Sequence, residues 1–237
     1  MTLTDEIKGL LNKTATATLT AALQRRGIRN TFLSELRPTQ PGRRMLGTAK
    51  TLRYVPMRED MAPVLSAAGR NAQRRAMESI EPGEVLVIEA RNDPTAGTIG
   101  DIFSMRVIAR GGTGIITDGC LRDSGAIAKL DVQVFYRAAH AATLARQHLP
   151  LEIDVPIACA GVLVMPGDVI VGDDDGAMVI PIALVDEVAR EAYEQELQDM
   201  WSFERVAAGE SVNGVFPIAK ERLPEYEAWK AARAAST

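Results

Sequence analysis

The spacing of apolar residues along the chain predicts helices at several places. Thr4 can cap a first helix, and residues 14–23 continue the helical pattern up to a stop at Gly27. Residues 59–79 are predicted to form one long helix, because apolar side chains recur there every three or four positions. Those positions are Met61, Val64, Leu65, Ala68, Ala72 and Met77.

Short apolar runs bounded by Gly, Pro and Asp predict buried strands between further helices. The expected strands cover residues 48–55, 84–88, 114–117, 132–136, 162–164, 169–171 and 177–180. The further helices are expected at residues 101–110, 182–208 and 224–235. This alternation indicates an α/β fold with helical N- and C-terminal extensions.

Domain organisation follows from the same pattern. Residues 1–209 are expected to form a single α/β domain, and residues 210–237 a C-terminal extension. Phe203, Phe216 and Trp229 need burial somewhere, so we expect the extension to pack on the domain or on a neighbouring subunit.

The composition of the chain bears on whether nucleic acid or a membrane is a binding partner. The chain has 237 residues, 46% hydrophobic and 24% charged, and a net charge of −4, which gives no global attraction to nucleic acid. Arg70, Arg74 and Arg75 form a local positive cluster, which we interpret as a solvated helix face or a subunit contact. No apolar run approaches the roughly 20 residues needed to cross a bilayer, so no membrane contact is expected.

The N-terminal sequence and the cysteines indicate the cellular compartment in which the protein is expected. Residues 1–6 show no basic segment followed by an apolar stretch, so no secretion signal is expected. Cys120 and Cys159 lie in unrelated contexts and form no metal-ligand spacing. We therefore expect a reducing, cytoplasmic setting.

Two segments carry candidate chemistry. Gly97 and Gly100 precede an apolar helix, whose first free amides can bind an anion; the alternative is a plain loop-to-helix turn. Arg122 and Asp123 end a turn directly after a buried strand, where ligands usually bind in α/β folds. An arginine can hold a carboxylate and an aspartate a hard divalent cation, although such a pair can also merely stabilise a turn.

Other polar residues are weaker candidates. The acidic run 173–175 lacks the spacing of a calcium loop and is interpreted as a turn between strands. His140, His148 and Cys120 are interpreted as structural or surface residues. The predicted helix 182–208 carries an acidic stretch whose members matter only if a neighbouring subunit brings this helix over the Arg–Asp turn. That stretch consists of Glu191, Glu194, Glu196 and Asp199.

Taken together, these motifs resemble a known family. The segment from Gly100 to Asp123, with Gly119-x-x-Arg122-Asp123 at its end, looks like class II 4-hydroxy-4-methyl-2-oxoglutarate aldolases and RraA-like regulators of RNase E. The turns at 166–168 and 172–176 also fit, and the resemblance spans roughly residues 15–210. It implies an RraA-like α/β/α sandwich with a swivelling β/β/α barrel-like core, assembled as a homotrimer or homohexamer.

The resemblance also implies roles for individual residues. It implies that backbone amides bind the pyruvate end of the substrate, namely those of Gly100, Asp101, Ile102 and Phe103. Arg122 would contact the same 2-oxo acid and stabilise enolate charge, and Asp123 would directly ligate Mg²⁺ or Mn²⁺. A glutamate of the adjacent subunit, Glu196 or Glu194, would hold a metal-bound water.

The activity implied is a divalent-metal-dependent aldolase reaction on a small-molecule 4-hydroxy-2-oxo acid, which releases pyruvate. Oxaloacetate decarboxylation would be a natural side activity, because it passes through the same enolate. The alternative is a non-catalytic, protein-binding regulator of RNase E. Asp123 favours catalysis, because the regulator branch often lacks the metal-binding aspartate.

Overall fold

The computed structural model describes residues 3–67 and 69–234, and a mixed β-sheet forms its centre. Parallel pairing joins β3 to β4, β4 to β6, and β6 to both β5 and β7, whereas the outer pairings are antiparallel. In order across the sheet, the strands are β1 (Phe32–Leu33), β12 (Gly176–Ile180), β11 (Val169–Asp173), β3 (Met45–Pro56), β4 (Glu84–Glu89), β6 (Gly114–Leu121), β7 (Gln133–Ala139) and β2 (Arg37–Pro38). Off this path, β5 (Gly97–Ile99) pairs with β6 and β8 (His148–Ile153) with β3, while β9 (Ile157–Cys159) and β10 (Val162–Val164) form a separate hairpin.

Alternating side chains of the strands fill different cores, since successive residues of a strand point to opposite faces. In β4, Val85 and Val87 belong to an inner core closed by the β9–β10 hairpin. Leu86 and Ile88 belong to a second core that includes Ala72 and other buried residues of the helices on that face. These strands are buried on both sides, which explains their continuous apolar sequence.

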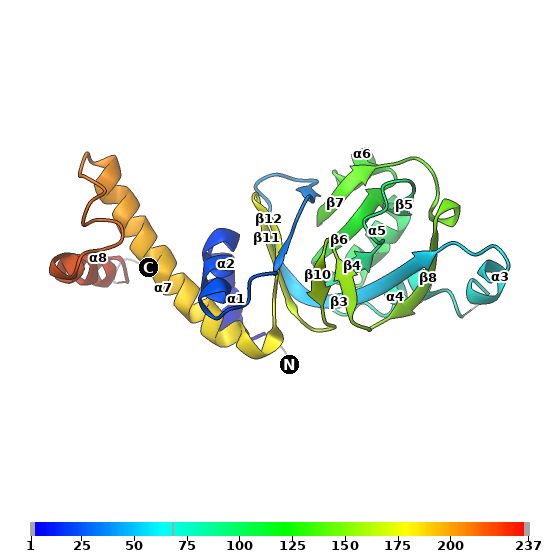
Figure 1. Cartoon of the computed structure of the whole chain (residues 1–237), viewed down its shortest axis with the longest axis horizontal. Coiled ribbons are helices and arrows are strands. Elements are labelled where there is room, and N and C mark those ends of the chain that lie inside the picture. Colours follow the sequence, from blue (N-terminus) through cyan, green and yellow to red (C-terminus); the bar gives the residue numbers. More distant parts are fainter. Residues whose placement is uncertain (1–2, 68, 235–237) are drawn as a thin grey trace.

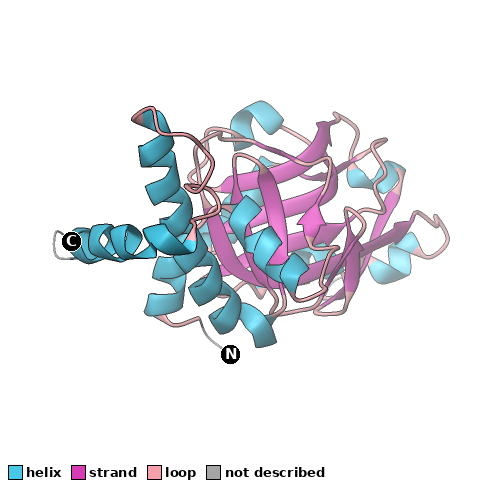
Figure 2. Cartoon of the chain, turned by 60° about the vertical axis from the view of Figure 1, so that its left-hand side comes forward, coloured by secondary structure: helices cyan, strands magenta, loops and turns pink. Residues whose placement is uncertain are grey.

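Helices cover the sheet on two sides (Figure 2). One group packs on the face formed by the even positions of β4, and a second group packs on β11 and β12. The first group comprises α4 (Ala72–Glu78), α5 (Asp101–Ala109) and α6 (Ser124–Ile127). The second comprises α1 (Asp5–Asn12), α2 (Thr16–Arg25) and α7 (Val185–Ala207), the last preceded by the short helical turn η2 (Ile182–Leu184).

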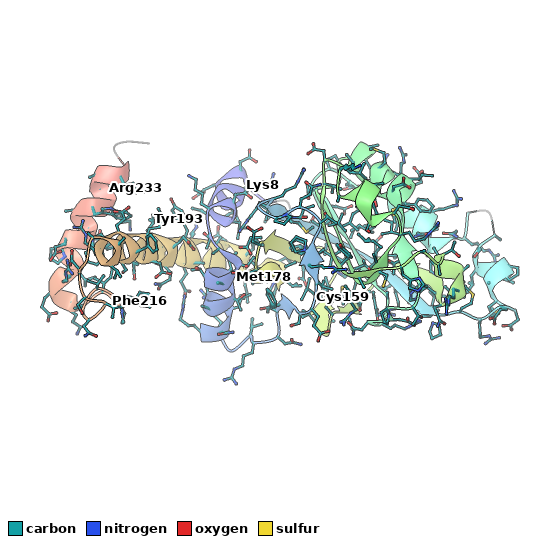
Figure 3. All side chains as sticks on the ribbon, turned by 90° about the horizontal axis from the view of Figure 1, so that it is seen from above. Lys8, Cys159, Met178, Tyr193, Phe216 and Arg233 are labelled. Atoms are coloured by element: carbon teal, nitrogen blue, oxygen red, sulfur yellow. The ribbon has the colours of Figure 1, made fainter. Side chains whose placement is uncertain are left out.

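The C-terminal end of the chain forms a separate small core. Helix α7 runs away from the sheet, and α8 (Leu223–Ala234) lies at its far end (Figure 1). Three side chains are buried together there: Trp201 of α7, Tyr226 of α8, and Val215 from the segment between these helices. The labelled Phe216 and Arg233 lie at the left end of the view in Figure 3, away from Cys159, which lies nearer its middle. The described part of the extension therefore packs on its own chain, although Phe203 and Phe216 remain 75% and 54% exposed.

Most predicted elements are confirmed, and the first helix illustrates why. The Thr4 hydroxyl accepts the amide hydrogen of Ile7 at 3.3 Å, which caps α1, and Gly27 follows α2 with φ +81°. The predicted helix end at 235, and Ala68 of the helix predicted at 59–79, lie outside the described residues.

Two predictions about elements are wrong. Residues 59–79 do not form one helix: α3 (Ala62–Leu65) and α4 are separated by a break at Gly69, which has φ +77°. The strand expected at 114–117 continues to Leu121, so Gly119 and Cys120 lie in β6 rather than in a turn. Pairing with β5 and β7 on either side extends it, and this pairing is not visible in the local sequence.

Five strands were not predicted. β1, β2, β5, β8 and β9 have two to six residues each, and β8 belongs to the segment that follows the helical turn η1 (Leu144–Arg146). Elements this short carry too few residues for a periodic pattern. Among the described residues, no helix has the length and apolar character needed to span a membrane.

Candidate active site

The carboxyl end of β6 and the start of α5 meet at one cavity of about 430 Å³. β5 leads into Gly100, which is the N-cap of α5, and β6 leads into Arg122 and Asp123. Because β5 and β6 run parallel, both segments leave the sheet at the same edge. The cavity is lined by Gln73, Arg74, Gly97, Thr98, Ile99, Gly100, Asp101, Ile102, Phe103, Arg122, Asp123, Thr143 and Leu144.

Glycine at two positions lets the side chains that directly follow β6 lie on the backbone that leads into α5. A Cβ at Gly97 would be 2.2 Å from Cγ of Arg122, so the stem of the arginine packs over that backbone. A Cβ at Gly100 would be 2.9 Å from Oδ2 of Asp123. The two glycines therefore allow the close approach of the guanidinium stem and the carboxylate to the start of α5.

Arg122 is held by its backbone and by one side-chain bond. Its amide donates to the Ile99 carbonyl at 3.0 Å, and its Nε donates to the Ala141 carbonyl at 3.2 Å. Among the described residues, no carboxylate lies within ion-pair distance of this guanidinium. Its terminal N–H groups are thus available to a carboxylate in the cavity, which an arginine can bind with two parallel hydrogen bonds.

Asp123 adopts a left-handed backbone conformation with φ +53° and ψ +33°. Its carbonyl accepts amide hydrogens from Ala126 and Ile127, so its backbone begins α6 while its side chain stays exposed. Such a conformation is uncommon for a residue other than glycine and is concentrated at functional sites. Within the described part of the chain no lysine or arginine pairs with this carboxylate, which leaves it available to a cation.

The start of α5 offers free amides, with one exception. The Asp101 carboxylate accepts the amide hydrogen of Ile102 at 2.8 Å, so this expected anion donor is occupied in the structure. The amides of Gly100, Asp101 and Phe103 have no hydrogen-bond partner among the residues that the structure describes. They lie at the positive end of the helix dipole, where an anion is stabilised.

The floor of the cavity is held by a buried network that the sequence did not indicate. The carbonyl of Thr98 accepts hydrogen bonds from the Tyr54 hydroxyl at 3.0 Å and the Gln73 amide at 2.8 Å. The Thr98 hydroxyl donates to the Cys120 carbonyl at 2.9 Å. Complete burial raises the pKa of Tyr54 above its ordinary value, so this phenol stays a donor.

Asp118 lies in β6, two residues before Cys120, but does not line the cavity. Its carboxylate is fully buried and accepts backbone amide hydrogens from Ala90, Asn92 and Ala160. Burial raises the pKa of Asp118, and these hydrogen bonds partly oppose the effect. This arrangement is typical of a structural carboxylate that stabilises a loop.

The structure does not bring Glu194 or Glu196 of the same chain to the cavity. Glu196 accepts the amide hydrogen of Ala15 at 3.1 Å, and Glu194 accepts the Tyr226 hydroxyl at 2.7 Å. Both belong to α7, which packs with β11 and β12 at one end of the sheet, away from α5 (Figure 1). Each carboxylate is thus engaged within its own chain, and their expected role toward a neighbouring subunit stays a prediction.

The residues at the cavity suit a divalent cation with few protein ligands. No group of three or more His, Cys, Asp or Glu side chains that could hold a metal occurs in residues 3–67 and 69–234. Asp123 and Asp101 are the two carboxylates that line the cavity. Mg²⁺ commonly binds through one or two carboxylates and completes its shell with water and substrate oxygens, so the donor set fits this ion.

The remaining weak candidates have structural surroundings. His148 is buried in β8, and burial together with the nearby Arg91 guanidinium lowers the pKa of its imidazole. The 173–175 run is the hairpin between β11 and β12, where Asp173 accepts hydrogen bonds from Thr16. Cys120 is buried and unpaired.

Comparison with known proteins places the chain in a family. The model of the RraA-like family (Aldolase/RraA) matches residues 16–179, which is more than half of the chain. The chain therefore belongs to the RraA-like family, and the resemblance noted from the Arg122-Asp123 motif is confirmed at the level of the family. The α/β fold with its mixed sheet is confirmed as well.

Two relatives identified by sequence carry aldolase names. A protein of Halalkalibacterium halodurans, named "Putative 4-hydroxy-4-methyl-2-oxoglutarate aldolase", is 32% identical over 167 residues, covering 70% of this chain and 73% of the relative. A Deinococcus radiodurans protein with the same name is 31% identical over 107 residues, covering 45% of this chain and 66% of the relative.

Two solved structures share the fold. Streptomyces coelicolor RraAS2, described as "an unusual member of the RNase ES inhibitor RraA protein family", superposes with a TM-score of 0.77 and 31% identity, covering 89% of this chain and 99% of that one. A Pseudomonas syringae protein superposes with a TM-score of 0.78 and 23% identity, covering 91% of this chain and 98% of that one. The second likeness concerns the fold alone.

Proposed function

We propose that this chain is a divalent-metal-dependent aldolase, a carbon–carbon lyase that cleaves a 4-hydroxy-2-oxo acid such as 4-hydroxy-4-methyl-2-oxoglutarate to pyruvate. The observation that carries the proposal is the contact of Arg122 and Asp123 with the Gly97–Gly100 backbone at the start of α5. This contact puts an unpaired guanidinium, an unpaired carboxylate and free helix amides at one cavity. The aldolase names of two relatives agree with it.

The chain's own residues account for binding and charge stabilisation. Arg122 would hold the carboxylate of the 2-oxo acid, with the amides of Gly100, Asp101 and Phe103 beside it. When the C3–C4 bond breaks, its electron pair passes to C3 as an enolate, and the 4-hydroxyl gives its proton to water and becomes a carbonyl. The guanidinium opposes the negative charge that develops on the enolate oxygen.

Asp123 would hold the divalent cation, Mg²⁺ or Mn²⁺, with Asp101 as the neighbouring carboxylate. The cation supplies Lewis-acid polarisation of the 2-oxo group when it is bound. Proton uptake at C3 completes the release of pyruvate. Oxaloacetate, which loses CO₂ across the corresponding C3–C4 bond and forms the same enolate, is expected to be decarboxylated as a side activity.

Assembly and location are part of the proposal. We propose a homotrimer or homohexamer in which residues 210–237 contribute to contacts between subunits; the exposed Phe203 and Phe216 support this assignment. Glu194 or Glu196 would then reach a water ligand of the partner's cation after leaving its present hydrogen bonds. The buried, unpaired cysteines support a reducing compartment, the cytoplasm.

The decisive experiment measures pyruvate release. With 4-hydroxy-4-methyl-2-oxoglutarate and Mg²⁺ or Mn²⁺, the purified chain is expected to release pyruvate, and EDTA is expected to stop the reaction. Asp123→Asn is expected to lower kcat/KM by about 1,000-fold or more, because it removes the charged ligand of the cation. Asp131→Asn, an exposed carboxylate outside the cavity, serves as the matched control.

Absence of pyruvate release with every divalent cation tested would reject the aldolase. The second candidate is a non-catalytic regulator of an RNase, which the 31% identity to Streptomyces coelicolor RraAS2 favours. Tight binding of an RNase E-type enzyme, unchanged by Asp123→Asn and without turnover of any 2-oxo acid, would support that alternative.

A further inference from the structure

We infer that Arg74 of α4 selects the substrate by binding a second anionic group, located on the half of the molecule beyond the bond that breaks. This inference rests on the proposed function, in which Arg122 already holds the carboxylate next to the 2-oxo group. It replaces the earlier interpretation of Arg74 as part of a solvated helix face.

Three contacts hold α4 beside the cavity, and a fourth involves the Arg74 side chain itself. The Asn71 side chain accepts the amide hydrogen of Arg74 at 3.0 Å and caps α4. The preceding residue, Gln73, donates to the Thr98 carbonyl in the cavity floor at 2.8 Å. Glu78, one turn further along α4, pairs with Arg106 of α5. The Arg74 guanidinium carbon itself lies 5.6 Å from the centroid of the Phe103 ring, a cation–π arrangement.

The guanidinium of Arg74 lacks an acidic partner within the described part of the chain. Glu78 on the same helix is occupied by Arg106. Arg74 nevertheless lines the cavity together with Arg122, and the two reach it from different elements, α4 and the end of β6. Two separate, unpaired guanidinium groups at one cavity match a ligand with two separate anionic groups.

The balance of charge points to the same ligand. The charged residues that line the cavity are Arg74, Arg122, Asp101 and Asp123, and their charges cancel. A bound divalent cation leaves an excess of two positive charges. A 2-oxo acid with one carboxylate neutralises half of this excess, whereas one with a second carboxylate neutralises all of it.

Neighbouring arginines provide an internal contrast. Arg75 is the next residue in α4 and is exposed, as Arg74 is, but it does not line the cavity. Arg70 lies before α4 and also lies outside the cavity lining. The inference therefore assigns the second anion site to Arg74 alone among the three arginines of the cluster.

Binding of two unreactive acids tests the assignment without turnover. 2-Oxoglutarate carries a second carboxylate at C5, and 2-oxopentanoate has a methyl group there but is otherwise the same chain. In calorimetric titrations with Mg²⁺ or Mn²⁺ present, the wild-type protein is expected to bind 2-oxoglutarate about 10- to 100-fold more tightly, the size of one charge-assisted hydrogen-bonded contact.

The variants are expected to separate Arg74 from its neighbours. Arg74→Met should remove the preference for 2-oxoglutarate and leave the affinity for 2-oxopentanoate unchanged, while Arg74→Lys should retain part of the preference. Arg75→Met, the matched control, should retain all of it. Equal binding of both acids by the wild-type protein, or an equal loss for both acids in Arg74→Met, would overturn the assignment.

Cleavage provides the second readout. With Arg74→Met, kcat/KM for 4-hydroxy-4-methyl-2-oxoglutarate should fall by the same 10- to 100-fold, chiefly through KM, and kcat/KM for 4-hydroxy-2-oxopentanoate should not change. Preferential binding of 2-oxoglutarate without any cleavage would reject the aldolase and retain the role of Arg74. Cleavage of both substrates with equal sensitivity to Arg74→Met would retain the aldolase and reject that role.

Discussion

The cavity at the end of β6 and the C-terminal end of the chain use their charges in opposite ways. At the cavity, Arg74, Arg122 and Asp123 have no oppositely charged partner among the described residues, although they lie near one another. At the C-terminal end, Glu194 binds Lys230 and Tyr226, and Arg222 pairs with Glu210 and Glu225. The Trp229 ring nitrogen donates to Glu204 at 2.8 Å.

This difference separates a binding site from a structural unit. Charges that pair with each other stabilise a local arrangement and have little capacity left for a ligand. Charges held near one another without partners raise the energy of the free protein, and a ligand of opposite charge relieves that energy. The C-terminal end, with its own buried aromatic core, is therefore interpreted as structure, and the cavity as the site of chemistry.

The largest expected effect concerns the core of the C-terminal end. Trp201 is 1% exposed and packs edge-on against Tyr226, with ring centroids 6.3 Å apart. Trp201→Ala is expected to cost about 3–5 kcal/mol of local stability, because it leaves a large cavity. Hydrogen exchange of the α8 amides measures this loss. Val206→Ala, on the same helix but 42% exposed, should change it by no more than about 0.5 kcal/mol.

Gly100→Ala tests the position of the Asp123 carboxylate at the cavity. The added Cβ would lie 2.9 Å from Oδ2 of Asp123 and displace the carboxylate, whereas the backbone at φ −116° accepts alanine. Since misplacing a catalytic group by about 1 Å can cost roughly 100-fold, kcat/KM for pyruvate release is expected to fall by about that factor.

Stability should respond differently from activity in this variant. The free energy of unfolding of Gly100→Ala is expected to stay within about 1 kcal/mol of the wild type, because the clash involves an exposed carboxylate. Gly9→Ala, where nothing lies within 4 Å of the added atom, is the control for a glycine substitution in a helix. Unchanged activity in Gly100→Ala would contradict the role assigned to the Asp123 position.

The smallest expected effect is a pH dependence confined to the C-terminal end. Burial raises the pKa of Glu194, but hydrogen bonds from Lys230 and Tyr226 outweigh it, and the net pKa lies below the ordinary value of 4.5. A depressed pKa means that the stabilisation is present above the unfolded-state pKa and is lost as the pH falls through the folded-state value. After solvent screening it amounts to about 0.5 kcal/mol.

Tryptophan fluorescence can follow this titration selectively. The chain contains two tryptophans, Trp201 and Trp229, and both belong to the C-terminal end. Acidification below about pH 4.5 is expected to shift their emission, and Glu194→Gln should make the shift smaller. Glu196→Gln, whose carboxylate contacts Ala15 instead of α8, should titrate like the wild type. The same curve for Glu194→Gln and the wild type would contradict the assignment.

Much of the fold was predictable because the periodic elements are long enough to carry a signal. β4 shows an uninterrupted apolar run after a Pro-Gly turn, and α5 begins directly after Gly100. The break at Gly69 was missed because apolar residues on both sides of it follow one helical spacing. The extension of β6 to Leu121 was missed because it depends on hydrogen bonds to β5 and β7, which come from elsewhere in the chain.

The sequence by itself determined most of the helices and the longer central strands, and that Arg122 and Asp123 follow a buried strand, because those properties depend on neighbouring residues. Only the tertiary structure decided that these side chains lie on Gly97 and Gly100, and that Arg74, 48 positions before Arg122, lines the same cavity. Contacts between segments this far apart arise when apolar faces pack together, and the packing of α4 against α5 and the sheet has no signature in the local pattern of either segment.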